Sequence, residues 1–342
     1  MDLTFLVMWL GFILAAYSVV GNDVIQTLGT FLTSNEKRLP WWVLWLFAAS
    51  ILLASLAYGY SQNDIDYGRL DKFTMPNEYP WYYLLPPIVL LSITRSGIPV
   101  STTFMILTLF SLSDIPNDLA AMFSSTFDTS TKLGGMIQKS VMGYLLAFTS
   151  AAVIYLAITR LTEKRFMENP LSQSGERIWT VFQWFTTGFL WFQWLTQDLA
   201  NIYIYLRGGE GLSTLGFAAS VAILLGLLAY IFYSKGGAVQ KVVREKTNTG
   251  DIRSATFVDL IYGIILYIFK YNYLGLFEGK LPMSTTWVFI GLLAGRELAI
   301  RLNLERKISS HAARMVFADL GKVFFGLVVS VVLVFIIKLL AG

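Results

Sequence analysis

Long apolar runs alternate with short polar connections along the whole chain. Several runs reach the roughly 20 residues that an α-helix needs to cross ~30 Å of hydrocarbon. We therefore expect an all-α polytopic membrane protein. The pattern predicts membrane-embedded helices or hairpins over Leu3–Ile25, Trp41–Tyr60, Trp81–Leu112, Ser140–Leu161, Ile178–Leu206, Leu215–Tyr233, Ala255–Phe277, Met283–Leu298 and Asp319–Leu340.

The composition agrees with this interpretation. Of the 342 residues, 55% are hydrophobic and only 14% are charged, unlike a soluble globular domain. The net charge of +4 reflects basic cytoplasmic loops better than a nucleic-acid partner. No cysteine is present, which excludes disulfides and thiolate–metal sites. The first run lacks a preceding basic segment, so we expect a retained first helix and not a signal peptide.

Basic residues are unevenly distributed among the connections, and loops rich in Lys and Arg face the cytoplasm. The basic loops carry Lys37, Arg38, Arg160, Lys164, Arg165, Arg177, Lys235, Lys241, Arg244, Lys246, Arg253, Arg296, Arg301, Arg306, Lys307 and Arg314. We expect the loops with few Lys and Arg residues, 61–80, 114–139 and 207–214, to be external. Both termini are also expected to be external, at a plasma (inner) membrane.

This orientation makes 81–113 a hairpin that enters from outside and 255–295 a hairpin that enters from inside. The chain then divides into two oppositely oriented halves, residues 1–161 and 178–342, joined by a cytoplasmic linker at 162–177. Inverted-topology repeats of this kind are common in secondary transporters.

A polar motif supports the division. The first run ends in Asn22, Asp23 and Gln26, with two apolar residues between Asp23 and Gln26. Polar groups here must face protein, water or an ion, although Asp23 alone is explained equally well as a helix cap at the interface. The same order of amide, Asp, apolar, apolar, amide recurs at Gln197–Asn201, around Asp198.

A second motif also occurs once in each half, as Pro99–Thr103 and Pro282–Thr286, each reading Pro, apolar, Ser, Thr, Thr. Proline suits the first turn of a helix, and the free N–H groups that follow favour an anion. Hydrogen bonding between helices is the alternative for one copy. Two copies, ordered like the Asp motifs, favour two half-helix ends that meet near the midplane. Because Asp23 and Asp198 would repel a bare anion, a cation must intervene, either Na⁺ on oxygen ligands or protons on the carboxylates.

At these motifs the chain resembles the inorganic phosphate transporter (PiT) family, which are sodium- or proton-coupled phosphate symporters. The resemblance rests on Gly21–Gln26 with Pro99–Phe104, and on Gln197–Asn201 with Pro282–Trp287. It implies cation-coupled symport of inorganic phosphate by alternating access, no enzymatic activity, no cofactor beyond the coupling ion, and a homo-oligomer in the lipid bilayer.

The two motifs and the resemblance together predict the site residues. The oxyanion is expected at Asp23, Ser101, Thr102, Thr103, Asp198, Ser284, Thr285 and Thr286. The coupling cation is expected at Asn22, Asp23, Gln26, Gln197, Asp198 and Asn201, with Na⁺ on Asn22, Asp23, Gln197, Asp198 and Asn201. Arg95, near the first hairpin tip, is a candidate for the anion pathway, with an interfacial arginine as the alternative.

The chain departs from the family pattern at several positions. Gln26 and Gln197 stand where the family has asparagine, and Phe104 and Trp287 where it has histidine. Sulfate transport and a transport-inactive sensor or scaffold therefore stay open as alternatives. An aspartyl protease built on Asp23 and Asp198 is disfavoured, because no Gly-x-Gly-Asp motif is present and the paired Ser-Thr-Thr motifs would have no purpose.

Overall fold

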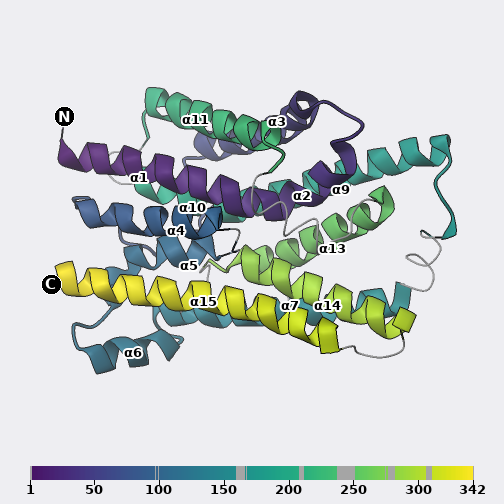
Figure 1. Ribbon diagram of the computed structural model, residues 1–342. Coiled ribbons are helices and arrows are strands. Elements are labelled where there is room, and N and C mark those ends of the chain that lie inside the picture. The colour runs from purple at the N-terminus through teal and green to yellow at the C-terminus, as the bar shows by residue number, and fades with distance from the viewer. Residues whose placement is uncertain are drawn as a thin grey trace.

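The computed structural model describes residues 2–96, 98, 100–158, 166, 168–207, 212–236, 251–273, 275, 282–305 and 310–341. Every regular element in these ranges is helical (Figure 1). The α-helices are α1 (Leu3–Val19), α2 (Ile25–Asn35), α3 (Trp41–Ser61), α4 (Leu85–Arg95), α5 (Thr102–Leu107), α6 (Leu119–Phe127), α7 (Lys132–Ile158), α9 (Gln173–Asp198), α10 (Ala200–Tyr203), α11 (Thr214–Tyr233), α13 (Ile252–Tyr271), α14 (Thr285–Glu305) and α15 (Ser310–Ala341).

Six helical stretches of the described residues are long and apolar enough to cross a membrane: Leu3–Asn35, Trp41–Ser61, Leu119–Ala157, Thr214–Tyr233, Ile252–Tyr271 and Val316–Leu340. Large apolar side chains such as Phe185, Leu215 and Phe317 lie on the outer surface, as lipid contact requires. The predicted all-α polytopic integral membrane protein is confirmed. Helix α9 carries many polar residues, and those facing the protein interior, among them Gln183 and Gln193, are buried.

The first helical stretch is longer than predicted. It continues without a break from α1 through a π-helical turn at Val20–Val24 into α2 and ends at Asn35, not at Ile25. A π-turn inside an α-helix often marks a functional site. The prediction ended too early because the polar side chains of α2 are buried against other helices. Asp23 lies inside this stretch, so the alternative in which it caps a helix end is wrong.

Two broken hairpins lie at the centre of the bundle. Helices α4 and α5 lie towards the end that carries both termini, and α13 and α14 extend towards the opposite end (Figure 1). Helix α4 packs on α1 and α13 on α9, while α5 packs on α15 and α14 on α7. Pro99, expected at the first hairpin tip, lies outside the described residues.

The later part of the first half contains more helix than predicted. The expected loop 114–139 forms α6, capped by Asp118, whose Oδ2 accepts from the Ala121 N–H at 2.9 Å. Helix α7 begins at Lys132 and not at Ser140. A search for long apolar runs misses both, because α6 is short with Ser124, Ser125 and Thr126 near its end, and α7 begins with Lys132 and two glycines.

Helices α14 and α7 approach each other closely because two glycines face the partner backbone. A Cβ atom at Gly291 would lie 2.4 Å from the Tyr144 carbonyl oxygen, and one at Gly295 would lie 2.1 Å from that of Phe148. Small residues four apart allow such backbone contact in membranes, where packing and not water drives association.

Substitution of Gly295 by alanine tests this contact. We expect Gly295→Ala to lower the unfolding free energy by about 1–3 kcal/mol, as overpacking of a tight interface does. Gly226→Ala is the matched control, because its Cβ would meet nothing within 4 Å. The thermal midpoint in detergent is the measurement, and equal midpoints for both variants would contradict this account of the packing.

Candidate functional site

The two motif carboxylates bind the first hairpin tip. Asp23 and Asp198 are each 1% exposed. The Thr102 hydroxyl donates to Asp23 Oδ2 at 2.5 Å, and the Thr103 hydroxyl donates to Asp198 Oδ1 at 3.4 Å. The Asn201 amide donates to both threonine hydroxyls and, at 2.9 Å, to Asp198 Oδ1. One tip is therefore held by polar motifs from both halves of the chain.

The second hairpin tip reaches the same place. The Thr286 hydroxyl donates to the Val100 carbonyl oxygen at 3.1 Å, and the Asn22 amide donates to that oxygen at 2.6 Å. The Thr286 side chain also lies close enough to Asp23, and the Thr285 side chain close enough to Asp198, to stabilise the charged carboxylates. The structure thus brings all four sequence motifs into one buried cluster at the centre of the bundle.

The serines of the two tips act differently from the threonines. Ser101 Oγ accepts from the Phe104 N–H at 3.1 Å, and Ser284 Oγ accepts from the Trp287 N–H at 3.4 Å. Each serine oxygen therefore caps the helix that follows it, as serine commonly does. The threonine hydroxyls make the contacts across the cluster.

Within the described part of the chain, three buried oxygens of the cluster have no hydrogen-bond partner: Asn22 Oδ1, Asp198 Oδ2 and Asn201 Oδ1. Gln197 Oε1 is also unpartnered there, but the Gln197 amide donates to the Gln193 and Leu266 carbonyl oxygens and not to the cluster. Such atoms are rare in folded proteins, and each one calls for an explanation such as an ion or water. Carboxylate and amide oxygens together form a ligand set suited to a hard cation. Gln26 differs, because its unpartnered atom is the amide nitrogen Nε2.

The aromatic residues that follow the two Ser-Thr-Thr motifs contact each other. The Phe104 and Trp287 rings lie 6.1 Å apart at 77°, and Trp287 also packs edge-on against Tyr144. The two side chains are thus a matched apolar pair that joins the two hairpins.

Arg95 does not contact the cluster in this structure. It lies exposed at the last turn of α4, with its guanidinium 5.9 Å from the centre of the Tyr17 ring. The interfacial alternative describes this position better than an anion pathway does.

A third buried carboxylate escaped the sequence prediction. Asp259 of α13 is fully buried, and its two oxygens accept from the hydroxyls of Thr30 and Thr187, each at 2.5 Å. The sequence shows this aspartate inside the apolar run Ala255–Phe277, where an acidic residue is unexpected. The prediction missed Asp259 because the first hairpin has no acidic residue that would form a repeated motif with it.

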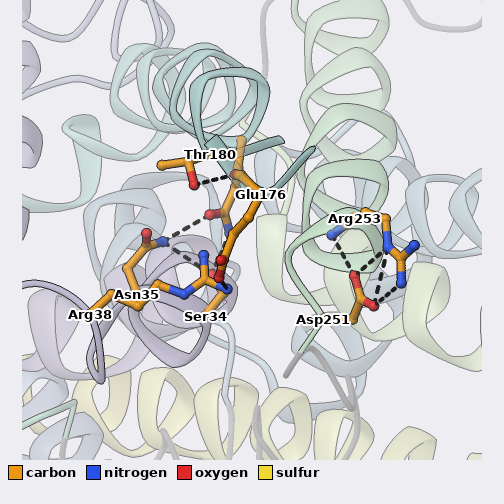
Figure 2. A network of polar contacts seen from close by, with 8 residues as sticks. Ser34, Asn35, Arg38, Glu176, Thr180, Asp251 and Arg253 are labelled. Atoms are coloured by element: carbon orange, nitrogen blue, oxygen red, sulfur yellow. Dashed lines mark hydrogen bonds and ion pairs between the residues drawn. The ribbon is translucent and has the colours of Figure 1, made fainter. Parts of the chain in front are cut away.

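Polar side chains continue from Asp259 to the surface between α2 and α9. The Gln183 amide donates to Ser34 at 2.5 Å and accepts from Asn35 at 2.8 Å. Further out, Arg38 pairs with Glu176 at 2.5 Å (Figure 2). We call this line of residues the polar seam. It ends in basic loops predicted to be cytoplasmic.

Fold and site together define a helical integral membrane protein with a closed polar centre between two broken hairpins. Among solved structures, the chain is similar to one described as "The sodium-dependent phosphate transporter", with a TM-score of 0.56 and 15% sequence identity over 99% of this chain and 98% of that chain. At this identity the likeness shows a phosphate transporter-like fold. Neither the family models nor the curated proteins compared with the sequence match it.

Removal of single donors tests the role of Asp259. Thr30→Val and Thr187→Val each delete one hydrogen bond to a buried carboxylate, so we expect each to lower the unfolding free energy by about 1.5–3 kcal/mol. The matched control is Thr180→Val, whose hydroxyl bonds only the Glu176 carbonyl oxygen of its own helix. Thermal midpoints in detergent report the effect. Midpoints equal to that of the control would show that Asp259 does not depend on these donors.

Proposed function

We propose that the chain is a secondary active transporter that moves inorganic phosphate across the membrane together with Na⁺ or H⁺. The observation that carries the proposal is the buried cluster, in which two Ser-Thr-Thr tips meet two carboxylates beside unpartnered oxygens. The fold shared with a structure described as a sodium-dependent phosphate transporter supports the choice of substrate and ion.

The oxyanion would bind the threonine hydroxyls and the N–H groups at the starts of α5 and α14. The first N–H groups of a helix have no partner within it, and the helix dipole favours negative charge there. Asp23 and Asp198 repel an anion at this point, so phosphate binds well only once a cation has neutralised them. By reciprocity the cation also binds more tightly once phosphate is present, so the binding of the two ligands is coupled.

Na⁺ is the coupling ion favoured here, with H⁺ as the alternative. The free oxygens of Asn22, Asp198 and Asn201 fit a cation better than a proton, since amide oxygens are poor bases and good ligands. Phosphate and sulfate are tetrahedral oxyanions of similar size, so the geometry of the site does not distinguish them. The choice of phosphate rests on the resemblance to phosphate transporters.

Alternating access would require the hairpins to separate. Asp23, Thr102 and Asp198 are each 1% exposed, so the cluster is closed to both sides. We propose that residues 1–161 and 178–342 are inverted repeats, on the basis of their matching motifs and of the matched packing of α4 on α1 and α13 on α9. We further propose external termini, a plasma-membrane location and a homo-oligomer, with a transport-inactive sensor as the alternative.

Uptake into proteoliposomes tests the proposal. Labelled phosphate and sulfate are compared with and without Na⁺ or pH gradients. We expect Na⁺-dependent phosphate uptake, reduced to background by Asp23→Asn and by Asp198→Asn because each removes a charge that the cation must balance. Asp114→Asn, at a surface ion pair with Lys132, is the matched control and should transport normally.

Each other outcome has a defined meaning. Absence of cation-dependent uptake of either oxyanion would contradict the transporter proposal. Uptake of sulfate alone would reassign the substrate, and full coupled transport by both Asp variants would move the site elsewhere.

A further inference from the structure

The second hairpin tip is held by two residues that belong to neither repeated motif. The Ser284 N–H donates to Ser140 Oγ of α7 at 2.9 Å. The Tyr262 hydroxyl of α13 donates to the Thr285 carbonyl oxygen at 3.1 Å. Ser140 and Tyr262 are both buried, so solvent does not compete for these contacts.

The two side chains that hold the tip are themselves fixed in direction. The Ser140 hydroxyl donates to the Met136 carbonyl oxygen of its own helix at 2.8 Å, which orients its oxygen as an acceptor for Ser284. The Tyr262 ring packs on Phe289 of α14, with 5.6 Å between the ring centres. The tip is therefore supported from two helices by side chains of defined orientation.

The start of α14 offers a small set of N–H groups to a ligand. The first N–H groups of an α-helix have no partner within the helix. Here the Trp287 N–H donates to Ser284 Oγ at 3.4 Å, and the Ser284 N–H donates to Ser140. Among the described contacts of this helix start, the N–H groups of Thr285 and Thr286 are left for an anion.

The planarity of the peptide unit links the two supporting residues to these N–H groups. The carbonyl and the N–H of one trans peptide unit lie in a plane and point in opposite directions. Tyr262 holds the Thr285 carbonyl and therefore fixes the direction of the Thr286 N–H. Ser140 holds the N–H of Ser284. The peptide unit between Ser284 and Thr285, which carries the Thr285 N–H, is thus fixed on both sides.

We propose that Tyr262 and Ser140 are positioning residues for the oxyanion, which keep the N–H groups of Thr285 and Thr286 in the direction that binds it. This inference rests on the proposed function. Donors that are fixed before binding lose less conformational entropy when the ligand arrives, so the anion binds more tightly. Both residues act through the tip, and neither is a ligand of the anion.

Removal of the Tyr262 hydroxyl tests the first contact. We expect Tyr262→Phe to raise the KM for phosphate uptake by the full chain in proteoliposomes about fivefold, the effect of losing one hydrogen bond. The maximal rate should be retained, because the ring still packs on Phe289. Tyr67→Phe is the matched control, since the Tyr67 hydroxyl also donates to a helix carbonyl oxygen, that of Ser55 at 2.8 Å. An unchanged KM in Tyr262→Phe would overturn the role of Tyr262.

Removal of the Ser140 hydroxyl tests the second contact. Ser140→Ala should raise the same KM by a similar factor, because the Ser284 N–H loses its acceptor and the tip is less fixed. Ser55→Ala is the matched control, a buried serine whose hydroxyl donates to the carbonyl oxygen four residues earlier, as that of Ser140 does. An unchanged KM would overturn this role. A lower KM would do so too, because the freed N–H would then serve the anion better than the supported tip does.

Thermal midpoints in detergent separate positioning from a purely structural role. A ligand stabilises the folded protein by an amount set by its concentration relative to its Kd. In Na⁺ buffer at one phosphate concentration, we expect a smaller phosphate-induced rise in midpoint for Tyr262→Phe and Ser140→Ala than for the wild type and the controls. A lower midpoint without phosphate, combined with a full phosphate-induced rise, would indicate a structural role only and overturn the proposal.

The same measurements distinguish this inference from the transporter proposal. If the wild type takes up no oxyanion, the transporter proposal fails, but a smaller phosphate-induced rise in both variants would still support positioning of the tip. If the wild type transports phosphate and both variants match their controls, only the positioning inference fails. Absence of any phosphate-induced rise in the wild type would also overturn the positioning inference.

Discussion

The structure depends on how two carboxylates are accommodated in the middle of a membrane protein. Asp23 and Asp198 are buried away from bulk solvent, and a charge in this environment is costly without partners. Their hydrogen-bond partners are Thr102 and Thr103 of the first hairpin tip and the amides of Asn22 and Asn201. The second tip binds the first through Thr286 and the Val100 carbonyl oxygen, so the bundle closes around one point.

That requirement accounts for the features around the cluster. The helix from Leu3 to Asn35 passes the centre through a π-helical turn, which presents Asn22 and Asp23 to the tips without ending the helix. Gly291 and Gly295 bring α14 against α7, which fixes the second hairpin firmly. Phe104 and Trp287 join the two hairpins through an apolar contact. Polar contacts thus define the position of the tips, and small or aromatic residues hold the hairpins there.

The two sides of the cluster have opposite chemical character. Towards the basic loops, the polar seam contains Asp259 with threonine, serine and amide partners and ends in the Arg38–Glu176 pair. On the other side, Arg69 in the connection between α3 and α4 is buried and is attracted electrostatically to Asp198. The cluster therefore has neutral and acidic oxygens on one side and a buried cation on the other.

The sequence by itself determined the helical membrane class and most helix positions, because apolar run length is a property of neighbouring residues. Its repeated motifs also predicted Asp23, Thr102, Asp198, Asn201 and Thr286, which the fold brings together. It did not determine the end of the first helix, since α2 is polar and is stabilised by burial against α9 and α13. It pointed to Arg95 and overlooked Arg69, because both are single arginines near a hairpin and only packing decides which is buried. Asp259 was likewise visible as one acid in an apolar run, but its meaning comes from Thr30 and Thr187, which are distant in sequence. Tertiary structure alone decided these positions, because the partners of a buried charge are brought together only by the fold.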